Sequence, residues 1–291
     1  MQRVASIIKE TNPGTFVHSV YLNEDLQKDQ NAGYFGYVND QVEFVCQQIS
    51  SIPELSQGFD AMGFSQGGLF LRAYAQRCNQ PPVRNLVTWG SPHYGISDLP
   101  PCSADDFVCQ QVHRVIKFGV YSGWARKNIV QAQYYRNPEE YDKYLEYNDF
   151  LADINNEYAD KNRTYSKNIA SLDRFVMIVF RNDTMLVPKE SSWFQSYDVK
   201  TGKLLPVKYT QMYRQDWLGL KALDSKAGLE FVGFPGDHMR FADKDLVDVI
   251  ERYFRPANEG VSYGEDDDRD RLEKSDPARR KESNGQRVFL I

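Results

Sequence analysis

The chain has 291 residues and a formal net charge of −5, which gives no reason to expect a nucleic-acid partner. Hydrophobic residues make up 41% and aromatic residues 13%, so the chain can bury a sizeable core, as one α/β domain with an insertion or as two small domains. No apolar run reaches the length of a transmembrane segment.

The first part of the chain alternates helical and extended patterns. Residues 1–10 are expected to form an amphipathic helix, residues 15–22 a strand, and residues 33–51 a second helix that ends before Pro53. The second helix is predicted because apolar residues recur at helical spacing: Phe35, Val38, Val42, Val45, Cys46 and Ile49.

A Gly-x-Ser-x-Gly motif lies at the next strand-to-helix transition. Gly63-Phe64-Ser65-Gln66-Gly67 follows a short apolar run and precedes a stretch of good helix formers. This context predicts a nucleophile elbow, the sharp turn that exposes a reactive serine in α/β-hydrolases. We expect Gly63 and Gly67 to leave room for the turn because they lack a Cβ atom. An incidental serine in a glycine-rich turn is the alternative.

More strands and a closing helix are predicted after the motif. Residues 83–89, 175–180 and 229–234 have strand patterns, and this alternation favours a mostly parallel sheet with right-handed crossovers. Residues 98–165 interrupt it with an aromatic, mostly helical insertion expected to lie over the site, whose tyrosines suit core packing or an acyl-binding wall. One apolar stripe indicates the last helix: Leu246, Val247, Ile250, Tyr253 and Phe254.

The composition changes near the end of the chain. We expect an α/β-hydrolase domain over residues 1–257. Charged and small polar residues dominate residues 258–291, and Glu265 to Asp268 form a short acidic run. Such a segment cannot bury enough apolar surface to fold alone, so this tail is predicted to be disordered.

Cysteines and glycosylation sequons indicate the cellular compartment of the protein. Residues 1–10 lack the apolar core and cleavage site of a signal peptide. However, glycosylation sequons begin at Asn162 and Asn182, and four cysteines allow three disulfide pairings. Together these features favour an oxidising compartment, and we expect that the natural protein begins before Met1.

A serine nucleophile needs a base and a carboxylate that orients the base. In α/β-hydrolases the chain order is serine, acid, histidine. His238 lies between the last predicted strand and the last predicted helix, so it is the predicted base, with His93 as its competitor. Asp183 directly follows the strand at 175–180 and is the predicted acid, with Asp237 as the alternative. Such a triad requires no metal and no cofactor.

The oxyanion hole is expected to use the backbone N–H of Gln66, the residue after the nucleophile. A second donor normally comes from a loop that follows an earlier strand. The sequence offers no segment that fits this role, so half of the oxyanion hole is expected to be missing.

The ordered motifs resemble those of the palmitoyl-protein thioesterases, from about Met1 to Phe254. The most specific matches are residues 62–68, 70–73, 76–78, 150–155, 182–184, 216 with 218–221, and 236–238. The resemblance implies the same Ser65, His238 and Asp183 triad. It also implies two disulfides and two glycosylated asparagines: Cys46 with Cys78, Cys102 with Cys109, Asn162 and Asn182.

The resemblance further implies hydrolysis of long-chain fatty acyl thioesters on protein cysteines in the lysosome, with a groove for the acyl chain beneath the insertion. S-acylated proteins would be the substrates and a fatty acid the product. A carboxylester lipase or esterase is the alternative, and the loop at residues 90–95, which departs from the family pattern, would suit one. An inactive, N-terminally truncated form is a further alternative.

The family pattern includes an interior strand that ends in His-Gly-Met-Gly, and this chain has no such motif before Ser65. We therefore expect the N-terminal strand beside the elbow strand to be missing, with two ladders left unpaired. Each unpaired buried backbone group costs about 1–3 kcal/mol.

Overall fold

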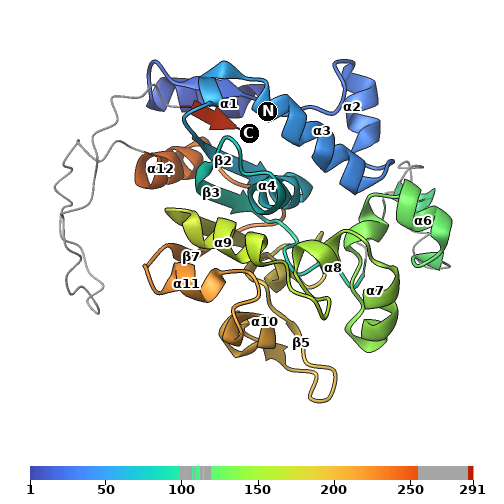
Figure 1. The fold of residues 1–291 in the computed structure, drawn as a ribbon. Helices are drawn as coiled ribbons and strands as arrows, with labels where there is room; N and C mark the ends of the chain where they lie inside the picture. Colours follow the sequence, from blue (N-terminus) through green and yellow to red (C-terminus); the bar gives the residue numbers. More distant parts are fainter. Residues whose placement is uncertain are drawn as a thin grey trace.

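The computed structural model describes residues 1–98, 102, 107, 109–111, 114, 119–254 and 288–290. A six-stranded sheet with helices on both faces organises the molecule (Figure 1). The strands lie in the order β1 (Phe16–His18), β8 (Val288–Leu290), β2 (Phe59–Phe64), β3 (Val83–Trp89), β4 (Arg174–Phe180) and β7 (Leu229–Phe234). All neighbouring pairs are parallel, as expected for an α/β-hydrolase fold.

The helices form two layers. One face of the sheet packs against α1 (Gln2–Thr11) and α12 (Asp243–Tyr253). The other packs against α3 (Val38–Ser50), α4 (Gln66–Arg77), α9 (Arg163–Ser171) and α11 (Leu220–Asp224). The remaining elements are α2 (Leu26–Ala32), α6 (Gly123–Asn128), α7 (Tyr141–Tyr147), α8 (Leu151–Ile154), α10 (Gln211–Arg214), the antiparallel pair β5 (Ser196–Tyr197) and β6 (Leu204–Leu205), and the 3-10 helices Pro53–Leu55, Gln131–Tyr134, Pro138–Glu140, Lys189–Trp193 and Val207–Tyr209. No helix in the described ranges is long and apolar enough to cross a bilayer.

Strand β4 shows how the sequence pattern sets the two layers. Successive side chains of a strand point to opposite faces. Phe175 and Met177 join the core beneath α3 and α4, whereas Val176, Ile178 and Phe180 join the core beneath α1 and α12. A continuous apolar run is therefore the pattern of an interior parallel strand, as predicted.

Two predicted boundaries are wrong. The helix expected from residue 33 begins at Val38, because Gly36 has a φ of +136° that a helix does not allow. Phe35 consequently lies outside the helix, 41% exposed, and forms an isolated bridge with Ile129.

The strand expected at residues 15–22 is limited to Phe16–His18. Two backbone N–H groups in the remainder of the predicted strand donate to side chains and not to a neighbouring strand. Tyr21 donates to Gln48 at 3.4 Å and Leu22 donates to Asp29 at 2.6 Å.

Strand β8 occupies the position between β1 and β2 where an N-terminal strand was expected to be missing. Phe289 pairs with Val17 on one side and Asp60 on the other. The prediction that the neighbouring strands lack all hydrogen-bond partners at this position is therefore wrong. The prediction of a disordered tail is also wrong for Val288–Leu290, because these apolar residues form an interior parallel strand. Residues 255–287, with the predicted domain boundary, and Ile291 lie outside the described residues.

All four cysteines are paired. Cys46 of α3 is bonded to Cys78, which directly follows α4, and Cys102 is bonded to Cys109. These are the two pairings that the family resemblance implied, so that prediction is confirmed.

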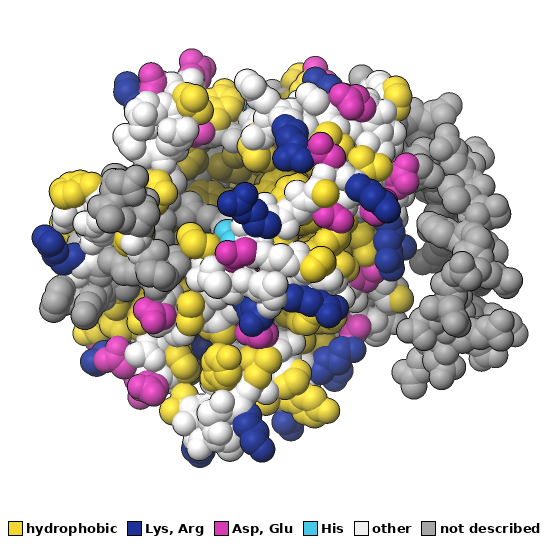
Figure 2. All heavy atoms as spheres, turned by 180° about the vertical axis from the view of Figure 1, so that it is seen from behind, with side chains coloured by type: hydrophobic (Ala, Val, Ile, Leu, Met, Phe, Trp, Pro, Cys, Tyr) yellow, Lys and Arg dark blue, Asp and Glu magenta, His cyan; other side chains and the backbone are white. Residues whose placement is uncertain are grey.

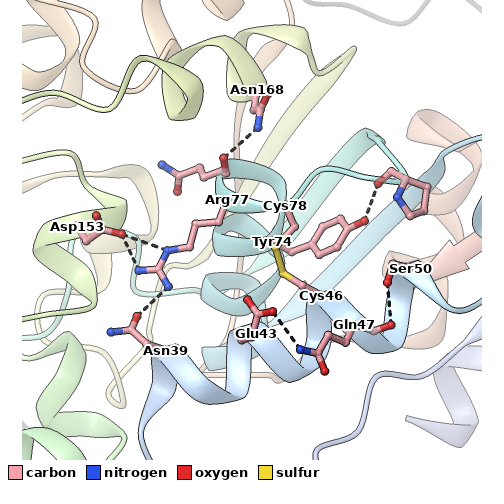
Figure 3. Close-up of a disulfide and its surroundings, with 12 residues drawn as sticks. Asn39, Glu43, Cys46, Gln47, Ser50, Tyr74, Arg77, Cys78, Asp153 and Asn168 are labelled. Atoms are coloured by element: carbon pink, nitrogen blue, oxygen red, sulfur yellow. Dashed lines mark hydrogen bonds and ion pairs between the residues drawn. A yellow bond between two sulfur atoms is a disulfide. The ribbon is translucent and has the colours of Figure 1, made fainter.

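The elbow helix α4 is also held by polar contacts beside the first disulfide (Figure 3). Arg77 donates to Asp153 at 2.6 Å and to Asn39 at 2.7 Å, joining α4 to α8 and α3. Asn168 of α9 donates to the carbonyl of Gln76 at 2.9 Å. Helix α4, which follows the predicted nucleophile, is thus held by hydrogen bonds to α3, α8 and α9.

Tyrosines of the predicted insertion surround a buried ion pair. Arg136 Nη2 lies 2.9 Å from Glu157 Oε1, and Tyr144 donates its hydroxyl to Oε2 at 2.6 Å. The Arg136 guanidinium also lies over the Tyr94 ring, 3.9 Å from its centroid. Because Tyr144 is fully buried, it has the core-packing role that was one of the two alternatives.

Candidate active site

Ser65, Asp183 and His238 meet at one edge of the sheet. They follow β2, β4 and β7, whose carboxyl ends share this edge because the strands are parallel. His238 Nε2 lies 3.0 Å from Ser65 Oγ, and His238 Nδ1 lies 2.6 Å from Asp183 Oδ2. Backbone N–H groups of Met185 and Leu186 donate to Asp183 Oδ1 at 2.8 and 3.0 Å and fix the carboxylate. This geometry allows the imidazole to accept the serine proton while the carboxylate orients it.

The elbow is strained and closely packed. Ser65 has φ +49° and ψ −124°, a conformation that non-glycine residues rarely adopt. A Cβ atom on Gly63 would lie 2.5 Å from the Gly68 Cα atom, so the predicted reason for this glycine holds. The same reason is wrong for Gly67, where a Cβ atom would have no neighbour within 4 Å. Gly68 is the second tight position, because its Cβ atom would lie 2.7 Å from Ser91 Cβ.

Gln66 begins α4, so its backbone N–H is one of the unpaired donors at the positive end of the helix dipole. Its side chain accepts a hydrogen bond from Tyr134 at 3.2 Å, which ties the elbow to the predicted insertion. In the sheet, Leu290 of β8 pairs with Ala61, well before Ser65. Residues 288–290 therefore do not reach the level of the nucleophile.

The competing histidine has a different environment. His93 is fully buried, its Nε2 lies 2.9 Å from Thr88 Oγ1, and its ring stacks on Phe194 with centroids 5.1 Å apart. Its Nδ1 atom has no hydrogen-bond partner among the described residues. His18 contacts a glutamine of α3, and His113 lies outside the described residues.

His93 should make stability depend on pH. Burial, followed by the nearby Arg72 charge, holds the pKa of His93 well below its ordinary value. The unfolded chain then binds more protons than the folded chain below about pH 6.5, so stability falls as the pH drops, by up to about 1.4 kcal/mol per pH unit. We expect His93→Gln to flatten this dependence in urea unfolding between pH 7 and 5. Comparison at pH 8 gives the cost of the substitution itself, and an unchanged slope would refute the assignment.

An apolar cavity of about 230 Å³ lies beside the elbow. It is lined by Met1, Val20, Tyr21, Leu22, Asp29, Gly33, Val45, Gly63, Phe64, Gln66, Gly67, Phe70 and Leu71. The space-filling view shows a hollow with largely hydrophobic walls, and a small part of a histidine is visible beside it (Figure 2). Apolar space next to a polar reactive group is typical of sites for ligands with long hydrocarbon parts.

Both sequon asparagines lie at the surface. Asn162 caps α9, where its side chain accepts from the Thr164 N–H at 3.0 Å. Asn182 directly precedes the predicted acid, Asp183, and its backbone N–H donates to Gly236 at 2.9 Å. Both positions are accessible for modification, so the predicted glycans remain predictions that the fold allows.

Comparisons with known proteins agree on one family. The profile described as "Palmitoyl protein thioesterase" matches residues 1–238. Palmitoyl-protein thioesterase 1 of Caenorhabditis elegans is 41% identical over 87% of this chain and 86% of its own length. Palmitoyl-protein thioesterase 3 of Dictyostelium discoideum is 35% identical, over 87% and 84% respectively. Lysosomal thioesterase PPT2-B of Xenopus laevis is 30% identical, over 80% and 79%. The chain therefore belongs to the palmitoyl-protein thioesterase family.

Proposed function

We propose that this protein hydrolyses palmitoyl and similar long-chain acyl thioesters on protein cysteines, with Ser65 as nucleophile, His238 as base and Asp183 as the orienting acid. The observation that carries the proposal is the hydrogen-bonded chain from Ser65 through His238 to Asp183 in a member of this family. Because relatives are named for this activity, the experiments must test the roles proposed for Ser65, His238 and Asp183.

The first step is acyl transfer to serine. Ser65 Oγ attacks the thioester carbonyl carbon while His238 Nε2 takes the hydroxyl proton, starting from the 3.0 Å contact. As the carbon–sulfur bond breaks, the proton passes from Nε2 to the departing cysteine sulfur. The Asp183 carboxylate holds Nδ1–H and stabilises the imidazolium that forms.

The second step returns the enzyme to its starting state. Nε2 takes a proton from water, and the hydroxide adds to the acyl carbon of acyl-Ser65. The carbon–oxygen bond to Ser65 then breaks, the fatty acid leaves, and the proton returns to Oγ. The Gln66 N–H at the start of α4 is the proposed donor to the carbonyl oxygen in both steps.

The cavity beside the elbow supports a long-chain substrate. It touches Gln66, the proposed oxyanion residue, and its walls are mainly apolar. A hydrocarbon chain bound there leaves water, which favours binding by about 0.8 kcal/mol per methylene. The first carbons of the acyl chain are proposed to lie in this cavity.

The lysosome or the secretory pathway is the proposed compartment. Both disulfides are of a kind that persists in oxidising compartments. A relative is named a lysosomal thioesterase, and glycans at Asn162 and Asn182 would accompany passage through that pathway.

Matched substrates test the proposal. An S-palmitoyl cysteine peptide and the same peptide carrying O-palmitoyl serine are offered to the purified chain, and palmitate release is measured. We expect faster turnover of the thioester. Preference for the oxyester would favour the esterase alternative, and no release from either substrate would favour an inactive form.

A further inference from the structure

Backbone hydrogen bonds join the two loops that carry the predicted acid and base. These bonds lie on the N-terminal side of Asp183 and His238. The Arg181 N–H donates to the Phe234 carbonyl at 2.8 Å, and the Asn182 N–H donates to the Gly236 carbonyl at 2.9 Å. The β4–β7 ladder thus continues beyond both strand ends, up to the residue before Asp183. Backbone pairing alone stops there.

Asp237 extends this connection through its side chain. Its Oδ1 atom accepts from the Thr184 N–H at 2.9 Å, the Thr184 hydroxyl at 3.0 Å and the His238 N–H at 2.7 Å. One carboxylate oxygen therefore holds the residue after Asp183 and the backbone of His238 at the same time. Asp237 is the alternative acid in sequence terms, but its carboxylate binds these groups, whereas Asp183 binds the imidazole.

The ionised form of Asp237 is the one suited to this role. The His238 N–H, followed by the Thr184 N–H and hydroxyl, donates to the carboxylate, and these bonds lower the pKa of Asp237. Asp237 and Thr184 are exposed, so water competes for the same hydrogen bonds and their contribution to global stability is small. Their effect is expected on local geometry, to which proton transfer is sensitive.

We propose that Asp237 is a positioning residue that clamps the acid loop to the base loop through Thr184 and thereby sets the Asp183–His238–Ser65 geometry. The proposal rests on the proposed function for its kinetic readout. It assigns no contact with the substrate, so it predicts a change in kcat and not in KM.

Asp237→Ala should lower kcat for the S-palmitoyl peptide by about 10- to 100-fold, because displacements near 1 Å cost this much. KM should stay within about twofold, since uniform binding is untouched. Asp237→Asn keeps an acceptor oxygen and should recover part of the loss. Thr184→Ser keeps the hydroxyl and should act like the wild type, whereas Thr184→Val should fall between the wild type and Asp237→Ala.

Two controls separate the clamp from other roles of this loop. Thr184→Val also destroys the sequon that begins at Asn182, so Asn182→Gln, which removes only the sequon, is the matched control and should keep full kcat. The His238 ring N–H resonance, read by NMR without substrate, should shift in Asp237→Ala and return part of the way to its wild-type position in Asp237→Asn. This signal tests the clamp even if the peptide is not hydrolysed by the wild type.

Several results would overturn the proposal. These are an unchanged His238 resonance in Asp237→Ala, an unchanged kcat, a rise in KM alone, or an equal loss of kcat in Asn182→Gln. Failure of the proposed function is distinct, because it would appear as the absence of thioester hydrolysis by the wild type.

Discussion

Ser65→Ala is expected to lower kcat for an S-palmitoyl peptide by on the order of 10⁴- to 10⁶-fold, because the substitution removes the atom that forms the acyl intermediate. The missing Oγ is the group 3.0 Å from His238 Nε2, and no described side chain replaces it at that position. KM should change little, since acyl-chain binding does not depend on the hydroxyl. Initial rates of palmitate and thiol release, with circular dichroism to verify folding, provide the measurement.

Ser91→Ala is the matched control. Ser91 is buried, whereas Ser65 is partly exposed, and Ser91 packs against the elbow at Gly68. Among the described residues its hydroxyl has only a long contact, 3.5 Å, with the Trp89 carbonyl. It lies within the loop at residues 90–95 that would suit the esterase alternative. Near-normal hydrolysis is expected for this variant. If Ser91→Ala lost most of its hydrolytic activity while Ser65→Ala remained active, Ser91 and not Ser65 would be the nucleophile.

Deletion of residues 288–291 is expected to remove much of the stability of the domain. Strand β8 pairs with both β1 and β2, and β1 has no other sheet partner among the described strands. Each buried backbone group left unpaired costs about 1–3 kcal/mol, against a typical total stability of about 5–15 kcal/mol. The urea midpoint should fall sharply, and the near-ultraviolet circular dichroism of packed aromatic residues should weaken.

Two substitutions test the strand itself without shortening the chain. Phe289→Pro removes a backbone donor at a residue that is paired on both sides, so it should reproduce most of the loss. Phe289→Val keeps a residue type favoured in strands and should be much milder. If both variants and the deletion keep the wild-type urea midpoint, β8 does not stabilise the sheet in solution.

The sequence predicts the sheet and the candidate triad well because few rules determine both. In a parallel sheet, residues that follow the strands converge at one edge, so Ser65, Asp183 and His238 are brought together by strand order alone. Strands 83–89 and 229–234 have their predicted bounds because proline and glycine residues, which favour turns, flank both segments. The choice of Asp183 over Asp237 as the imidazole partner also agrees with the contacts, because adjacent residues usually point apart.

What the sequence did not reveal depends on contacts between distant segments. The role of Gly68 follows from its approach to Ser91, which no local pattern encodes. The start of α3 at Val38 depends on the backbone angle at Gly36. Val288-Phe289-Leu290-Ile291 is an apolar run that stands out from the charged tail. However, the pairing partners of residues 288–290 lie far away in the sequence, at Phe16–His18 and Asp60–Ala61. Such pairing is not visible in local periodicity.

Trapping the acyl intermediate tests the role of Ser65 as nucleophile most directly. The wild type is mixed with excess S-palmitoyl peptide, quenched in acid within the first turnover, digested, and mapped by mass spectrometry. We predict palmitate in ester linkage on Ser65, appearing as the peptide thiol is released and absent in Ser65→Ala. Release of thiol and palmitate with no palmitoyl group on Ser65, or undiminished hydrolysis by Ser65→Ala, would contradict it.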